Sequence, residues 1–224
     1  MRTYARQVRA LLWKDLSIEC QTKDVVLSIL VFGLLALTVF VFSFDLRADS
    51  LLLVSPGVLW VAIIFAGTVG LGRSYSHERE RGSMEGLLLC PMDRSAVYIA
   101  KLLTNLVYMG AATAVLVPVF AGFFGAPVLR LPVLAVILLG VVGLSAVGTV
   151  FGAMAVNTRA REVMLPVLLF PVLVPLVISA VKATGQLMDG QPWPTTWTNL
   201  LMGFDIVYLV VSFIVFEFVI EDWG

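Results

Sequence analysis

Six long apolar stretches constrain this chain more than any other feature of its sequence. They cover residues 25–44, 51–71, 96–124, 131–156, 163–181 and 200–220. An α-helix needs about 20 such residues to cross the hydrocarbon core of a bilayer. The 224 residues are 60% hydrophobic and 13% charged, whereas a soluble domain carries roughly 25% charged residues. The sequence therefore predicts an all-α integral membrane protein, a single domain over residues 1–224 with six transmembrane helices.

The basic residues predict how these spans are oriented. With alternating spans, twelve of the fifteen Lys and Arg residues fall on the side that holds both termini, and Arg47, Arg130 and Lys182 fall on the other. Cytoplasmic loops carry an excess of Lys and Arg, so both termini are predicted to be cytoplasmic. The formal net charge is zero, and no basic patch stands apart from the membrane flanks, which argues against a nucleic-acid partner.

Residues 1–20 read as an amphipathic helix that lies on the membrane. One arc of it is apolar and the opposite side is basic, and Asp15 and Glu19 interrupt the apolar arc. The apolar arc holds Tyr4, Ala5, Val8, Leu11, Leu12 and Leu16, and the basic side holds Arg2, Arg6 and Arg9. This pattern favours an interfacial helix bound to an anionic bilayer surface. A frayed basic tail is the alternative.

The long polar interruption at 73–101 is the next organising feature, and 82–91 is its centre. Gly82 and Ser83 offer a break and an N-cap, and Pro91 ends the helix that would follow. Met84, Leu87 and Leu88 give that helix an apolar face beside Glu85. Such a helix at the membrane surface suits the groove of another protein. A charged loop with one chance helical turn is the alternative.

Two later spans carry unusual residues. Gly148 and Gly152 have the spacing that lets helices approach closely, either within one subunit or in a homodimer. Pro166, Pro171 and Pro175 each remove a backbone donor from the fifth span. That span is therefore predicted to be kinked or broken, and these prolines are hinge candidates, with harmless kinks as an equal alternative.

The segment 182–199 is predicted to be the longest external segment. Trp193 and Trp197 lie in it, where aromatic rings favour the membrane interface, and they are grouped with Asp205 as a candidate external surface. A binding surface for a flat apolar ligand is the alternative for the two tryptophans. Asp205 itself falls about a turn and a half inside the sixth span, where a carboxylate is costly and often functional.

No catalytic motif is present in the sequence. It lacks a phosphate-binding loop and the zinc-protease, serine-hydrolase and Cys-x-x-Cys patterns. His77 is the only histidine and lies among charges, and Cys20 and Cys90 are expected to be free thiols. We therefore predict that the chain is not an enzyme and binds no metal or cofactor of its own.

One stretch of sequence resembles a known family. Residues 55–62 (SPGVLWVA), followed by Arg73, Glu78, 82–85 (GSME), Leu87, Pro91 and 100–101 (AK), resemble the heme exporter protein B (CcmB) family of cytochrome c maturation. The resemblance implies a fold similar to ABC-2 type permeases in the bacterial inner membrane. It also implies that 82–91 is a cytoplasmic coupling helix, with Glu85 as an acidic contact for a separate ATPase subunit that binds ATP. A heme-handling, tryptophan-rich membrane subunit is the second partner it implies.

Three functions remain open from the sequence. The first is the permease-like subunit of an ATP-driven complex for heme export or release of heme from a carrier, with heme as the substrate of the complex. The second is an ABC-2 exporter of a lipid, glycan or drug. The third is an assembly subunit that transports nothing and transmits ATPase motion to its neighbour; the lack of an external histidine as a heme ligand favours it over literal heme passage.

Overall fold

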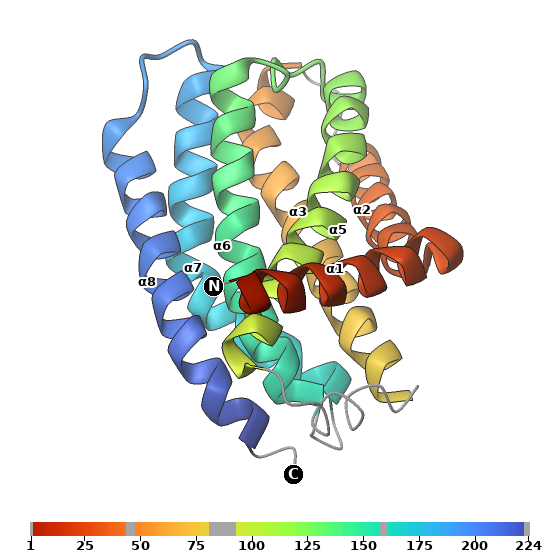
Figure 1. Ribbon diagram of the computed structural model, residues 1–224. Coiled ribbons are helices and arrows are strands. Elements are labelled where there is room, and N and C mark those ends of the chain that lie inside the picture. Colours follow the sequence, from red (N-terminus) through yellow and green to blue (C-terminus); the bar gives the residue numbers. More distant parts are fainter. Residues whose placement is uncertain (1, 44–47, 81–92, 157–160, 222–224) are drawn as a thin grey trace.

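The computed structural model describes residues 2–43, 48–80, 93–156 and 161–221, and every structural statement below concerns this part of the chain. It is all-helical over these residues, with one bundle of long helices and one helix lying across it (Figure 1). The helices are α1 (Arg2–Thr22), α2 (Asp24–Ser43), α3 (Ala48–Glu80), α5 (Arg94–Phe124), α6 (Leu131–Val156), α7 (Arg161–Met188) and α8 (Thr195–Glu221).

Six of these helices are long and apolar enough to cross a membrane, as the sequence predicted. α6 is the most enclosed, with 72% of its apolar window buried, whereas only 22% of the α2 window is buried. A Cβ atom on Gly148 would lie 2.3 Å from Leu71 Cδ1, and one on Gly152 would lie 2.5 Å from the Tyr75 ring. These two glycines therefore let α3 pack closely on α6 within one chain, which confirms the intrasubunit alternative.

The outer end of the bundle differs from the prediction. α7 continues to Met188 and α8 begins at Thr195, so most of the predicted external segment 182–199 is helical. Gly190 has φ +75° and ends α7, with the N–H of Gln191 donating to the carbonyl of Gln186 at 3.0 Å. This is a bond of the Schellman type of helix end. Apolar composition alone underestimated both helices, because their outer turns extend beyond their most hydrophobic residues.

α7 is one uninterrupted helix although it contains three prolines. The expectation of a broken span is therefore wrong for this helix. Pro171 and Pro175 are exposed on its outer side, and Pro166 is half-buried. The Ser179 hydroxyl donates to the carbonyl of Pro175 at 2.6 Å, one turn away. Each proline lacks a backbone N–H, so α7 is a continuous helix in which some backbone hydrogen bonds are missing.

α1 lies across the bundle and the chain turns from it into α2 (Figure 1). Lys23, between the two helices, has φ +57°, an unusual conformation for a residue with a side chain. The Glu19 carboxylate accepts from the backbone N–H of Val26 at 2.8 Å and of Val25 at 3.4 Å. Glu19 therefore satisfies backbone donors at the start of α2 that have no partner within the helix.

Candidate functional site: the α1–α5 polar network

The side of α1 that faces the bundle carries acidic residues as well as apolar ones. Leu11, Asp15 and Glu19 recur every four residues, so they share one face, and all three are buried. Trp13 points away and is 73% exposed. Asp15 and Glu19, which break the apolar arc of the sequence, are therefore the residues by which α1 docks on the bundle.

Asp15 forms a buried ion pair with α5. Its Oδ2 lies 2.7 Å from Lys101 Nζ, and both side chains are less than a tenth exposed. Its Oδ1 lies 3.2 Å from Lys14 Nζ, on the edge of the site, where the lysine side chain is 37% exposed. Tyr108 adds a third contact, because its hydroxyl donates to the main-chain carbonyl of Asp15 at 3.0 Å. α1 is thus fixed to α5 through both its side chain and its backbone.

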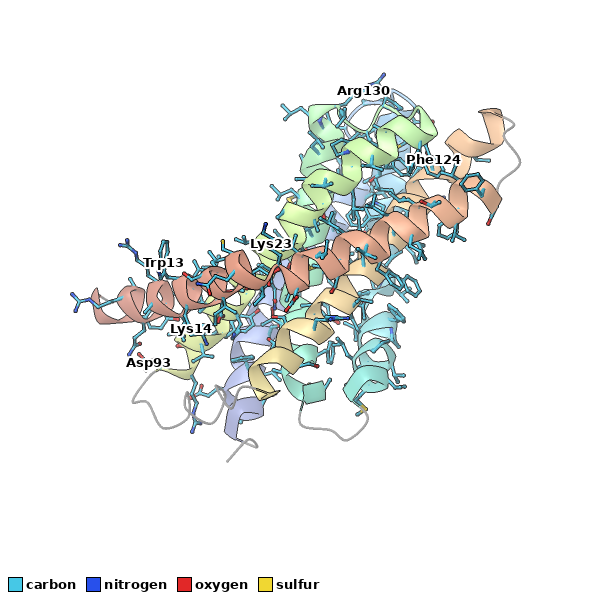
Figure 2. All side chains as sticks on the ribbon, turned by 90° about the vertical axis from the view of Figure 1, so that its right-hand side faces the viewer. Trp13, Lys14, Lys23, Asp93, Phe124 and Arg130 are labelled. Carbon is cyan, nitrogen blue, oxygen red and sulfur yellow. The ribbon has the colours of Figure 1, made fainter. Side chains whose placement is uncertain are left out.

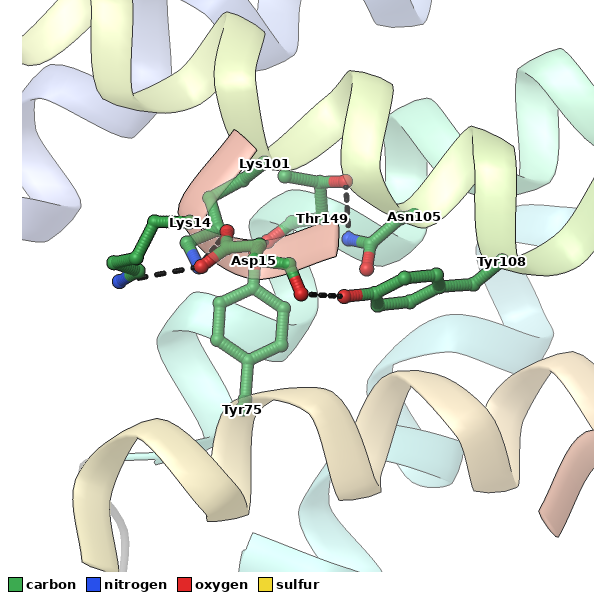
Figure 3. Close-up of polar contacts among 7 residues, drawn as sticks. All are labelled: Lys14, Asp15, Tyr75, Lys101, Asn105, Tyr108 and Thr149. Atoms are coloured by element: carbon green, nitrogen blue, oxygen red, sulfur yellow. Dashed lines mark hydrogen bonds and ion pairs between the residues drawn. The ribbon is translucent and has the colours of Figure 1, made fainter. Parts of the chain in front are cut away.

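A second set of hydrogen bonds carries the contact from α5 into α6 and α3 (Figure 3). Asn105 Nδ2 donates to Thr149 Oγ1 at 2.9 Å. The Tyr75 hydroxyl donates to the carbonyl of Thr149 at 2.7 Å. We call these seven residues the α1–α5 polar network: Lys14, Asp15, Tyr75, Lys101, Asn105, Tyr108 and Thr149. It joins four helices, α1, α3, α5 and α6.

A separate apolar cluster surrounds part of this network and extends it to α8. It contains Leu11 of α1, Tyr75 of α3 and Tyr98 of α5. The Tyr98 ring lies 5.2 Å from the ring of Phe216 and 6.1 Å from that of Phe213, both on α8. This end of the bundle therefore has its own small core, distinct from the main one, and α1 is part of it.

The network lies close to the ends of the two helices that flank the segment 81–92. Within the described residues, no group of three or more His, Cys, Asp or Glu side chains is placed to hold a metal ion. Tyr75 lies five residues before the end of α3, and Lys101 lies seven residues after the start of α5. These are the two helices that the segment 81–92 connects. A displacement of that segment therefore acts on helices whose ends are already tied to α1 and α6.

The residues predicted from the sequence have different outcomes. The coupling residues Gly82, Ser83, Met84, Glu85, Leu87, Leu88 and Pro91 lie outside the described residues, as does the side chain of His77. Trp193 is exposed at the outer loop, whereas Trp197 is half-buried against the main core. Asp205 is only 4% exposed and lies inside the bundle. The prediction that Asp205 belongs to an external surface is therefore wrong. α8 begins at Thr195 and not at residue 200, so Asp205 lies ten residues from the start of its helix.

Sequence reasoning missed most of the network. Lys101 was predicted to lie on the cytoplasmic side, at the end of the polar segment 73–101 and within the span 96–124; it is buried and bonded to Asp15 of α1. Lys101, Asn105 and Tyr108 lie at positions i, i+4 and i+7 of one apolar span. That spacing places them on one helix face. It is the feature of the sequence that could have predicted a polar contact on this span. It did not identify the partner helix, because nothing in the spacing indicates that α1 folds back over α5.

Comparisons with known proteins agree with this fold. The family model described as "CcmB protein" matches residues 6–221. Heme exporter protein B of Pseudomonas aeruginosa is 30% identical over 164 residues, which cover 73% of this chain and 74% of that protein. Heme exporter protein B of Rhodobacter capsulatus is 29% identical over 82% of this chain and 84% of its own length. The protein of the same name from Paracoccus denitrificans is 28% identical over 79% and 81%.

Proposed function

Because the chain belongs to the CcmB protein family, we propose that it is the permease-like membrane subunit of an ATP-driven complex for heme export or heme-carrier release in cytochrome c maturation. The support is the family match over nearly the whole chain and the name "Heme exporter protein B" carried by relatives at 28–30% identity. Six long apolar helices fit a multi-pass membrane subunit. Its place is the bacterial inner membrane, with both termini in the cytoplasm.

The ATP is bound and hydrolysed by a separate cytoplasmic subunit, which docks on the segment 82–91. The sequence supports this, because it lacks a phosphate loop and gives that segment a capped amphipathic pattern with Glu85 as the charged contact. The α1–α5 polar network carries the proposal furthest. It ties α5 to α1 and to α6, and α3 to α6, which gives a push on 82–91 a direct route into the bundle.

A tryptophan-rich, heme-handling membrane subunit is the proposed second partner, and a second copy of this chain is an alternative neighbour. A second candidate role is one in which this chain transmits ATPase motion and transports nothing itself; the lack of an external histidine as a heme ligand supports it. In that role the chain needs two packing arrangements of its helices, and no heme path through its interior. Heme is then the substrate of the complex and is handled by the neighbour.

The proposal is tested in a bacterium that makes c-type cytochromes, by deleting its own copy of this gene and supplying the chain from a plasmid. We expect heme-stained c-type cytochromes to disappear on deletion and to return with the wild-type chain. Glu85→Arg should lower co-purification of the ATPase subunit, because removing one partner of a charge pair costs roughly 2–5 kcal/mol. Asp93→Arg, an exposed acid just outside the docking segment, is the matched control and should leave co-purification unchanged. Normal cytochrome yield in the deletion strain would refute the heme function and favour export of a lipid, glycan or drug.

A further inference from the structure

Asp205 lies inside the membrane-spanning bundle, ten residues from the start of α8. It packs against α6 at Gly143 and beside Leu176 of α7. A Cβ atom on Gly143 would lie 2.2 Å from Asp205 Oδ1 and 2.6 Å from Leu176 Cδ1. Only glycine at position 143 therefore leaves room for this carboxyl group beside α6.

Neither oxygen of the Asp205 carboxyl group has a hydrogen-bond partner among the residues that the structure describes, although both are fully buried. α6 contains no titratable residue at any position. On α7 the nearest charged residue is Lys182, which is exposed and lies six positions beyond Leu176. On α8 itself, Tyr208 packs its ring on Phe204, and Glu217 is exposed three turns away. On α5, the titratable Tyr98 packs against α8 at Phe213 and Phe216, two turns or more beyond Asp205.

An ionised carboxylate in such a place is shielded from solvent and, among the described residues, has no hydrogen-bond donor. Burial of that kind favours the neutral form of the acid. In membrane proteins, acids within the spans mark ion or proton sites far more often than they serve packing. The role of Asp205 is independent of the α1–α5 polar network, which lies on other helices and satisfies its own charges.

We propose that Asp205 is a proton-binding site within the bundle, occupied while α8 packs on Gly143 and emptied when the two helices separate. In the packed arrangement the carboxyl group is the neutral acid. When α8 moves away from α6 and water enters, the O–H bond breaks, the electron pair stays on the carboxylate oxygen and the proton passes to water. Low pH therefore favours the packed arrangement of α8 on α6, and high pH favours their separation.

Infrared difference spectroscopy on the full chain in lipid bilayers tests the first half of this proposal. The spectrum of wild type minus Asp205→Asn, recorded at about pH 6, should contain the C=O stretching band of a neutral carboxylic acid, although ordinary aspartates ionise near pH 4. Glu217→Gln is the matched control, an exposed acid on the same helix, and the band assigned to Asp205 should be absent from its difference spectrum. A difference spectrum for Asp205 with only carboxylate bands would overturn the proposal.

Should Asp205→Asn fail to fold, the same band is assigned in the wild type by ¹³C labelling of aspartate carboxyl groups. The band should then move with labelled aspartate and stay in place with labelled glutamate; its absence at about pH 6 overturns the proposal equally. Gly143→Ala tests the second half. Its added methyl group forces α8 away at Asp205, so the neutral-acid band should weaken, and an unchanged band would reject the link between packing and proton binding.

Discussion

At the scale of single residues, the stability of α1 on the bundle depends on what stands opposite the Asp15 carboxylate. Lys101→Met removes the ammonium group 2.7 Å away and leaves a buried charge with the edge contact of Lys14. Breaking one side of a buried pair costs about 3–5 kcal/mol, and the remaining lysine places the expected loss at the lower end. The loss is measured as a drop in the unfolding midpoint of the detergent-solubilised protein.

Lys14→Met is the matched control for this change. It removes the other cation of the same carboxylate, but its side chain is 37% exposed, and an exposed pair contributes less than about 1 kcal/mol. The double change Asp15→Leu with Lys101→Met should restore most of the lost stability, because an apolar pair of similar volume replaces a buried ion pair well. Equal drops in the unfolding midpoint for Lys14→Met and Lys101→Met would show that the buried ion pair contributes no more to stability than the exposed one.

The glycines of α6 give a second prediction at the residue scale. Gly140 faces Trp60, whose ring would lie 2.1 Å from an added Cβ atom and is held in place by a 3.0 Å hydrogen bond to Thr184. Gly140→Ala should therefore lower stability by about 1–3 kcal/mol through overpacking. Gly110→Ala, where no atom lies within 4 Å, should be neutral or stabilise by up to about 1 kcal/mol through helix propensity. Similar unfolding midpoints for the two variants would contradict the close contact.

At the scale of helices, the sequence predicts which helices exist better than it predicts where they end or which other helices they contact. All six spans were predictable, because the length and hydropathy of each reflect the bilayer itself. The ends of α7 and α8 were not, because a helix can continue through polar residues such as Lys182 and Gln186 where its own backbone bonds are satisfied. The docking of α1 was not predictable either, since Asp15 and Glu19 look like faults in an amphipathic helix until Lys101 and the start of α2 are opposite them.

The prolines of α7 make a prediction that separates stability from function. Replacing Pro166, Pro171 and Pro175 by Ala restores three backbone donors to a helix that is already continuous. Each change favours the helix by about 3 kcal/mol in intrinsic propensity, so the variant should be at least as stable and should assemble. If the prolines give α7 compliance, cytochrome c yield should fall although the complex is intact. Wild-type yield from this variant would reject the hinge and leave the prolines as harmless features.

At the scale of the whole molecule, the charge count predicts which end of the bundle faces the cytoplasm. Asp93 and Arg130 lie at opposite ends of it (Figure 2). Single cysteines at Asp93 and Gln191, both exposed, in a background with Cys20 and Cys90 replaced by Ser, should react from opposite sides of the membrane. An impermeant thiol reagent added outside intact spheroplasts should label Gln191→Cys alone. Labelling of Asp93→Cys from outside would invert the topology and remove the ATPase contact proposed for 82–91.

The last prediction asks whether the α1–α5 polar network transmits motion or only holds helices together. The stable double variant Asp15→Leu with Lys101→Met keeps α1 docked through apolar contact and through the Tyr108 hydroxyl on the Asp15 carbonyl. It loses the ion pairs of Asp15 with Lys101 and with Lys14, and with the first of them the directional link between α1 and α5. Under the proposed function, the ATPase subunit should still co-purify and hydrolyse ATP, while cytochrome c yield falls severalfold.

The double variant should be compared with Asn105→Leu. That change removes the hydrogen bond from α5 to Thr149 and leaves the Asp15–Lys101 ion pair intact. If movement passes from α5 both to α1 and to α6, each variant should lower cytochrome c yield with the ATPase still bound, and combining them should lower it further. If the network serves stability alone, yield should follow the unfolding midpoint in every variant. A double variant with wild-type stability and wild-type yield would therefore assign Asp15 and Lys101 to the docking of α1 and to nothing beyond it.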